Sequence, residues 1–521
     1  MHDSDSISSA STVAAVYKTD GFDVETKSAF SPAYTDDFTL NSEDNHEEQL
    51  DRLAKELGIK RWRLQMKIDL WILLPICLLY LLAFLDRVNI SNANAYGMSD
   101  DINLKGNQFN IALAVFFVPY IIFEIPANFL LKKMSPHVFL PLCLLAFGGV
   151  SIGQGFVKNY HELIVTRVLL GLLETAMFPA CFYLLGCWYT RTEAQKRYSF
   201  FFCSTSLAGA FGGLIAYGVH SFSGKFGIEG WRWIFIVEGA ITGFCGLLLF
   251  FLIADFPEQA RFLNDKERIF ITKKIELDVG KSSFESRITL KDIFKVLVDW
   301  RVIICALSYF GCIVGGYGYA YFSVAIIKTF GYSALDTQVH SIYPWIATFG
   351  CSMIVAILSD ISKHRYLYTL GCLFISVAGY GMLLGTSPTE SYSHVRYAAC
   401  FLIVIGLYSA MPLIICWANM NFAGHSRKMV ASAFQVGFAN TGGIISVFVY
   451  RSQDAPGYRM GIWVSLALLL LTVGSTTVYF ICLVLVNNRR NRGDYASEFN
   501  ALSEHEQEKM GDLNPSFRYM Y

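Results

Sequence analysis

The sequence contains twelve long apolar stretches, and these restrict its possible folds more than any other feature. A helix that crosses the hydrocarbon core of a bilayer needs about 20 predominantly apolar residues. Six stretches of that length precede residue 255, and six follow residue 300. They cover approximately residues 69–88, 109–131, 138–157, 162–186, 199–220, 233–254, 302–327, 340–358, 366–386, 396–418, 430–450 and 460–486. We therefore expect an all-α membrane protein with twelve transmembrane helices in two halves of six.

The composition supports this expectation and argues against other classes of protein. Hydrophobic residues make up 54% of the 521 positions and charged residues only 16%, which is too little polar surface for a soluble protein of this length. The formal net charge is zero, so no electrostatic argument favours nucleic acid as a partner. Most of the 13 cysteines lie inside apolar runs, and there is no Cys-x-x-Cys or His-Glu-x-x-His motif. We expect no metal, no cofactor and no catalytic residue.

Polar segments divide the chain into five parts. Residues 1–65 are rich in Ser, Thr, Asp and Glu and are predicted to form a disordered tail. Residues 66–254 and 301–486 are the two halves, joined by a charged central loop at 255–300 and followed by a polar tail at 487–521. An even number of crossings puts both tails on one side of the membrane. The loops on that side carry more Lys and Arg, so both tails and the central loop are predicted to be cytoplasmic.

Ionisable residues inside the apolar stretches are the first candidates for a functional site. Each charge in a bilayer core costs roughly 2.5–3.5 kcal/mol on insertion scales, so such residues are rare and usually functional. The first half contains Asp86, Arg87, Glu124, Arg167 and Glu174. Arg167 and Glu174 are seven residues apart, which places them on one helix face about 10 Å apart along the axis. Two arginines near carboxylates predict a site that holds a substrate carboxylate and accepts a proton.

Structural explanations compete with this interpretation. The arginines and carboxylates at positions 86, 87, 167 and 174 could instead form ion pairs that hold helices together. Glu124 precedes Pro126 and could belong to a helix kink. Glu238 follows Arg232 near the start of its segment, so we expect it to be a structural partner of that arginine.

The second half offers polar and aromatic residues in place of charges. The candidate proton-coupling residues are thus Asp86, Glu174 and Glu124, all from the first half. The candidate substrate-binding residues are Arg87, Arg167, Asn89, Tyr317, Tyr321, Asn419 and Asn440.

The layout of six helices, a long loop and six helices is that of the major facilitator superfamily. Within it, residues 65–490 resemble the fungal anion:cation symporter family, often called the allantoate permease family. The segments that carry the resemblance are Leu85-Asp86-Arg87-Val88-Asn89-Ile90, Glu124-Ile125-Pro126-Ala127-Asn128, Arg167 to Glu174 with Pro179, Gly230 to Gly239, Asp255-Phe256-Pro257, Gly424 to Lys428 and the ending Asn514 to Tyr519.

The resemblance implies a symporter in the plasma membrane that uses the proton gradient to take up a small organic anion. In related transporters, the acids matching Asp86 and Glu174 carry protons, and the arginines matching Arg87 and Arg167 serve the anion. Residues 230–256 and 262–268 are most similar to nicotinate permeases. Allantoate, ureidosuccinate, pantothenate and biotin are alternative substrates. We also expect the protein to work as a monomer in the lipid bilayer.

Three other classes of function remain as alternatives. An intramembrane enzyme would need a nucleophile with a base, or paired metal ligands, but the charges within the helices are carboxylates and arginines without histidine. A membrane nutrient sensor would bind the same ligand without moving it. A facilitator without proton coupling would transport the anion independently of pH and of the Glu174 carboxyl.

Overall fold

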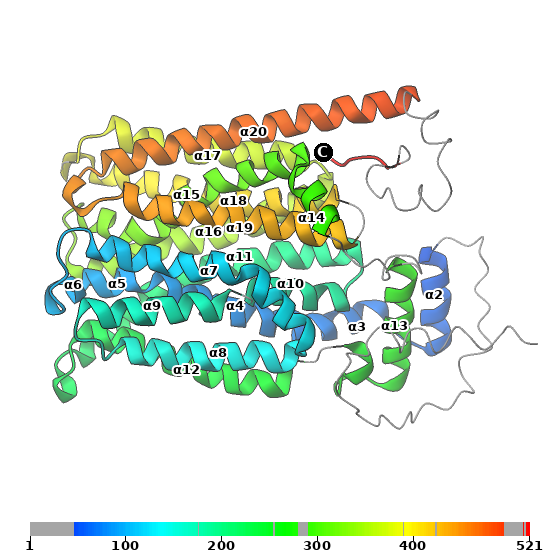
Figure 1. Ribbon diagram of the computed structural model, residues 1–521, viewed down its shortest axis with the longest axis horizontal. Coiled ribbons are helices and arrows are strands. Elements are labelled where there is room, and N and C mark those ends of the chain that lie inside the picture. The colour runs from blue at the N-terminus through cyan, green and yellow to red at the C-terminus, as the bar shows by residue number, and fades with distance from the viewer. Residues whose placement is uncertain are drawn as a thin grey trace, which may run out of the picture.

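The computed structural model describes residues 46–175, 177–253, 256–279, 290–388, 390–422, 425–493, 514 and 517–521. Their regular secondary structure is helical, and the long helices lie side by side in one bundle (Figure 1). Within the described residues, 11 helices are long and apolar enough to cross a membrane, and the apolar part of a further helix spans Gln108–Glu124. The predicted all-α membrane fold is thus confirmed.

The N-terminal half begins with a crossing that contains several helical pieces. These are α3 (Arg61–Ile68), the π-helical turn η2 (Asp69–Leu73), α4 (Leu74–Val88) and α5 (Ile90–Ala95). The remaining helices of this half are α6 (Met98–Asp101), α7 (Gln108–Lys133), α8 (Pro136–Gln154), α9 (Tyr160–Glu174), α10 (Met177–Trp188), α11 (Arg191–Val219) and α12 (Gly230–Leu252). The crossings lie within a few residues of their predicted positions, with two exceptions: the first is extended at both ends, and the fifth begins at Arg191 instead of residue 199.

The C-terminal half consists of six long helices. They are α15 (Trp300–Lys328), α16 (Ala334–Ser362), α17 (Arg365–Gly385), α18 (Ser393–Met420), α19 (His425–Val449) and α20 (Arg459–Arg492). The two halves meet mainly where α11 packs on α16 and where α7 packs on α19. Short 3-10 turns lie in the connections at His220–Phe222, Lys225–Gly227, Pro257–Gln259, Glu390–Tyr392 and Ser452–Asp454.

Helix boundaries in the N-terminal half lie beside two of the candidate residues. Helix α4 ends at Val88 and α5 begins at Ile90, but the backbone hydrogen bonds continue across Asn89, whose N–H donates to the Leu85 carbonyl at 3.0 Å. Helix α9, which ends at Glu174, and helix α10, which begins at Met177, belong to one apolar span, Tyr160–Trp188. Arg87 and Glu174 therefore lie inside their membrane crossings and not at the ends of them.

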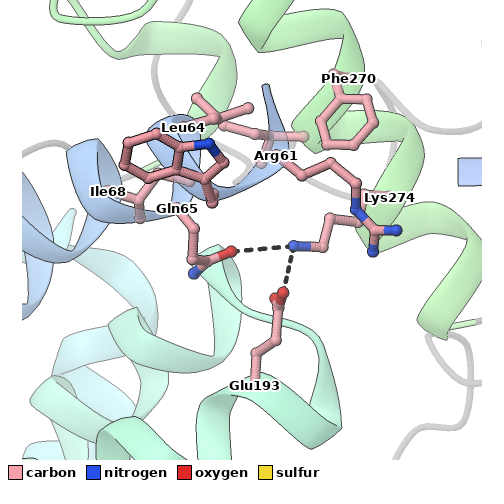
Figure 2. A pocket seen from close by; sticks show the side chains of 9 residues that line it. Arg61, Leu64, Gln65, Ile68, Glu193, Phe270 and Lys274 are labelled. Carbon is pink, nitrogen blue, oxygen red and sulfur yellow. Dashed lines mark hydrogen bonds and ion pairs between the residues drawn. The ribbon is translucent and has the colours of Figure 1, made fainter. Parts of the chain in front are cut away.

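The N-terminal tail is helical from residue 46, which corrects the predicted disorder up to residue 65. Helices α2 (His46–Leu57) and α13 (Asp265–Val279) lie together at one end of the bundle, here called the tail end (Figure 1). Lys274 of α13 donates hydrogen bonds to Gln65 of α3, at 3.3 Å, and to Glu193 of α11, at 2.7 Å (Figure 2). The central segment is therefore tied to the first and fifth crossings. Residues 1–45 lie outside the described residues.

The C-terminal residues also pack at the tail end. Residues 487–492, predicted to begin a polar tail, continue α20 instead. The Met520 carbonyl accepts hydrogen bonds from Trp417, at 2.8 Å, and from Asn421, at 3.0 Å. Arg301 and Arg490 both donate to the Tyr519 hydroxyl. The last residues of the chain thus connect the ends of α15, α18 and α20.

Asp299 joins two helices of the C-terminal half at the same end. Helix α14 (Leu290–Leu297) precedes it, and its carboxylate caps α15 by accepting from the Arg301 N–H at 2.9 Å. It also forms ion pairs with the Arg301 and Arg427 side chains. Burial acts to raise the pKa of Asp299, but the hydrogen bonds and charge of Arg301, with the charge of Arg427, outweigh it and hold the pKa below its usual value.

We expect Asp299→Asn to lower the thermal unfolding temperature at neutral pH. A depressed pKa in the folded state stabilises the protein above the unfolded pKa of about 3.9, and the effect is lost as the pH falls through the folded pKa. The difference from wild type should therefore shrink below about pH 4. The control is Asp265→Asn, whose side chain is 84% exposed. A difference that stays constant with pH would contradict the assignment.

Gly171 allows the closest approach between α7 and α9. A Cβ at this position would lie 2.2 Å from the carbonyl oxygen of Phe116. Gly171→Ala should therefore force the helices apart and lower both the yield of monodisperse protein and the unfolding temperature. The control is Gly149→Ala on α8, where a Cβ meets no atom within 4 Å. Equal stability of the two variants would show that the contact is not needed.

Candidate functional site

A buried ion pair links the first and fourth crossings. Arg87 on α4 is 2% exposed and Glu174 on α9 is 1% exposed. The Arg87 Nε lies 3.2 Å from Glu174 Oε2, and Nη2 donates to Oε1. This side-on arrangement satisfies both carboxylate oxygens and gives the pair no net charge. The removal of either partner would leave an uncompensated charge in a dry interior.

The other half of the protein also contacts this ion pair. Arg87 Nη1 donates to the hydroxyl of Tyr317 on α15. That hydroxyl donates to Oδ1 of Asn440 on α19, at a long distance of 3.4 Å. A chain of polar contacts therefore runs from α9 and α4 to two helices of the C-terminal half.

Aromatic rings surround the guanidinium of Arg87. Its Cζ lies 5.0 Å from the ring centroid of Phe116 and 5.3 Å from that of Tyr120. Tyr317 also faces it, at 5.6 Å, and Tyr321 stacks on Tyr317 with 5.8 Å between centroids. Such rings favour a cation by their quadrupole and offer flat surfaces to a planar ligand.

A second polar cluster lies beside the ion pair and contains two carboxyl groups. Asp86 on α4 accepts a hydrogen bond from Ser151 at 3.2 Å. Asn89, three residues after Asp86, donates to Glu238 of α12, and the two carboxyl groups act on each other electrostatically. Glu238 was expected to be a structural partner of Arg232, but Arg232 pairs with Asp101 at 2.8 Å. Glu238 is buried because, six residues after Arg232, it lies about 9 Å further along α12 and on a different face of the helix.

Arg167 is buried near both clusters. It is 1% exposed, and its Nε and Nη2 have no hydrogen-bond partner among the described residues. Tyr321, Asp86, Glu238 and Glu174 all exert an electrostatic influence on it. Nε and Nη2 are adjacent donors on one edge of the guanidinium, and their spacing matches the two oxygens of a carboxylate. Arg167 can therefore hold an anion.

A cavity of about 280 Å³ reaches this region from the end of the bundle opposite the tails. It lies between α5, α7 and α15. The residues that line it include Ser91, Asn94, Phe109, Tyr321, Lys328 and Tyr458. Tyr321 lines the cavity and is also close enough to both arginines for their charges to act on it.

Comparisons with known proteins identify the family. A profile described as Major Facilitator Superfamily matches residues 76–447. The chain belongs to the major facilitator superfamily. It is therefore a membrane transporter of small molecules and not an enzyme.

The relatives of this major facilitator protein include several fungal transporters. An uncharacterised transporter of Schizosaccharomyces pombe is 33% identical over 461 residues, which cover 88% of this chain and 91% of the relative. The high-affinity nicotinic acid transporter of Saccharomyces cerevisiae is 30% identical, with coverage of 88% and 85%.

Solved structures of major facilitator proteins share the fold. A bacterial homologue of the lysosomal transporter Spinster has a TM-score of 0.60 at 14% identity and covers 79% of this chain and 96% of its own. The proton:xylose symporter XylE has a TM-score of 0.61 at 17% identity, with coverage of 78% and 94%.

The remaining candidate residues of this major facilitator protein differ in their positions. Glu124 of α7 is 4% exposed and faces α19, where a Cβ on Gly437 would lie 2.8 Å from its Oε2. It therefore lies between the two halves. Asn419 accepts from Ser432 near the tail end of α18, outside the two clusters.

Two residues of the site escaped the sequence analysis. Tyr120 faces Arg87. It lies in an apolar helix that contains other aromatic residues, and its position in the sequence does not distinguish it from them. Glu238 was interpreted as structural, although it is an acid within an apolar segment like the other candidates. The cost of its burial was the signal that could have identified it.

The ion pair predicts a specific pattern of stability in this major facilitator protein. Glu174→Leu should lower the free energy of unfolding by about 3–5 kcal/mol, because it leaves the buried Arg87 charge without a partner. The double variant Arg87→Met, Glu174→Leu should recover most of that loss. Denaturant unfolding in detergent micelles would measure both. The control Leu172→Ala changes an exposed side chain of the same helix. A double variant as unstable as the sum of its singles would contradict the pairing.

Proposed function

We propose that the protein is a proton-coupled symporter that takes up a small organic monocarboxylate, with nicotinate as the leading candidate. The observation that carries this proposal is the side-on pair of Arg87 and Glu174 beside the donor edge of Arg167, which has no partner in the part of the chain that the structure describes. We further propose that it acts as a monomer in the plasma membrane, with both tails in the cytoplasm.

Charge balance supplies the coupling. With Glu174 ionised and no substrate, the ion pair is neutral. With Glu174 protonated and a substrate carboxylate on Arg87, the site is neutral again. A proton without the anion, or the anion without a proton, leaves a net buried charge, which is costly in the membrane interior. The two neutral states are therefore favoured, and the proton and the anion bind together.

The surroundings of Arg87 favour a flat, aromatic substrate. Phe116, Tyr120 and Tyr317 surround the guanidinium, and Tyr321 stacks on Tyr317. A carboxylate on a planar ring would place its charge on an arginine and its ring among these side chains. The nicotinic acid transporter of S. cerevisiae is a relative over most of both chains. Allantoate, ureidosuccinate, pantothenate and biotin lack an aromatic ring and are the alternative substrates.

The proposed direction of transport is inward. The cavity that reaches Tyr321 opens at the end opposite the tails, which the positive-inside rule assigns to the outside. Asn110 of α7 donates to the carbonyls of Val447 and Tyr450 near that end, so the two halves already touch there. Rocking of the halves around the central site would expose it to each side in turn.

Uptake of labelled nicotinate tests the substrate directly. Cells that lack their own nicotinate carrier should accumulate it when they express this protein, and more strongly from acidic medium. Unlabelled benzoate and pantothenate serve as competitors with and without an aromatic ring. The absence of uptake above background would exclude nicotinate as a transported substrate. Saturable binding of nicotinate without uptake would favour a nutrient sensor.

Variants test the coupling. Glu174→Gln and Asp86→Asn should lose accumulation driven by a pH gradient but retain part of the exchange of labelled for unlabelled substrate. Each coupled proton multiplies the accumulation ratio about tenfold per pH unit, because one unit corresponds to about 1.4 kcal/mol. The control is Leu248→Ala, whose side chain is 43% exposed. Unchanged accumulation in both variants would favour a facilitator without proton coupling.

A further inference from the structure

We propose that Asp86 and Glu238 bind one proton between them and, with Arg167, form a proton site separate from the Arg87–Glu174 pair. This assigns Glu238 to the transport machinery. The proton site stands on its own geometry, whereas its role toward the substrate rests on the proposed function.

The first argument comes from the closeness of the two carboxyl groups. Asp86 is 1% exposed and Glu238 is 0% exposed, and the two carboxyl groups are close enough to act on each other electrostatically. A carboxylate can only accept, so a hydrogen bond between two carboxyl groups requires that one of them carries a proton. Asp86 Oδ2 and Glu238 Oε1 have no donor among the described residues. The shared proton would satisfy both oxygens.

The second argument comes from the neighbours of the pair. Ser151 donates to Asp86, and Asn89 donates to Glu238. These neutral donors can stabilise one negative charge on the pair. Two negative charges close together in a dry site would repel each other strongly.

The third argument is charge balance with Arg167, the charged group that acts on both acids. One proton on the pair leaves one negative charge, which balances the positive charge of Arg167. No proton would leave the cluster negative, and two protons would leave it positive. Tyr321 and Glu174 are the other titratable groups that act on Arg167, and Glu174 is already neutralised by Arg87.

This arrangement has a consequence for substrate binding. The pair balances the charge of Arg167 while its Nε and Nη2 remain without hydrogen-bond partners among the described residues. The guanidinium therefore keeps a free edge for an incoming carboxylate without standing as an isolated buried charge. A carboxylate held between Arg167 and Arg87 would have its charge balanced by the proton that Glu174 takes up. Glu174 differs, because it occupies the donors of Arg87 directly.

Infrared spectroscopy of the purified full-length protein tests the shared proton without any substrate. A protonated carboxyl group has a carbonyl stretching band that a carboxylate lacks. At neutral pH, Glu238→Gln and Asp86→Asn should each reduce this band by one carboxyl group. In either variant the remaining acid becomes ionised, because the new amide can donate to it and Arg167 balances it. The double variant should lower the intensity of this band by the contribution of one carboxyl group and no more.

Two other outcomes would overturn the proposal. A double variant that loses two carboxyl groups would show that each acid carries its own proton. An unchanged band in both single variants and in the double variant would show that neither acid is protonated. The carboxyl-to-amide control is Asp265→Asn on the exposed face of α13, and the helix control is Leu248→Ala on α12. If one single variant fails to fold, the other still distinguishes a protonated from an unprotonated pair.

The same variants separate failure of this proposal from failure of the proposed function. If nicotinate is not transported but the band changes as expected, the proton site stands and the substrate is wrong. If transport is proton-coupled but the band is unchanged in both single variants and in the double variant, coupling proceeds without this pair, and Glu238 is structural.

Discussion

The ion pair between Arg87 and Glu174 is the constraint on which the rest of the site depends. Both side chains lie in the dry interior, where a lone charge is costly, so each is held there only with a partner. The pair lies against the C-terminal half through Tyr317. A change of the hydrogen-bonding partner of Arg87 therefore alters contacts in both halves of the protein. Transport by alternating access requires such a connection.

The two crossings that carry this ion pair place it deep in the bundle. Arg87 lies in the span Arg61–Ala95 and Glu174 in the span Tyr160–Trp188. Neighbouring helices supply further polar contacts beside Arg87, since Asn89 donates to Glu238 of α12 and Ser151 of α8 donates to Asp86. Ionisable groups at this depth are tolerated where other protein groups surround them.

The sequence predicted much of the site because buried charges stand out in apolar segments. Asp86, Arg87, Arg167 and Glu174 were identified on that basis alone, and the structure brings them into two adjacent clusters. Their partners were harder to predict. Arg87 pairs with Glu174 from another helix, and Glu238 faces α4 instead of Arg232. Asn419, selected only for its polarity in an apolar segment, lies elsewhere.

The sequence by itself determined the number of crossings, their approximate ends and the inventory of buried charges. It could do so because each helix must be long enough and apolar enough to cross the bilayer by itself. Only the tertiary structure decided which charges meet. That outcome depends on the rotation and spacing of neighbouring helices, which contacts such as Gly171 against Phe116 set. Such contacts join residues far apart in the chain, so no local period in the sequence encodes them.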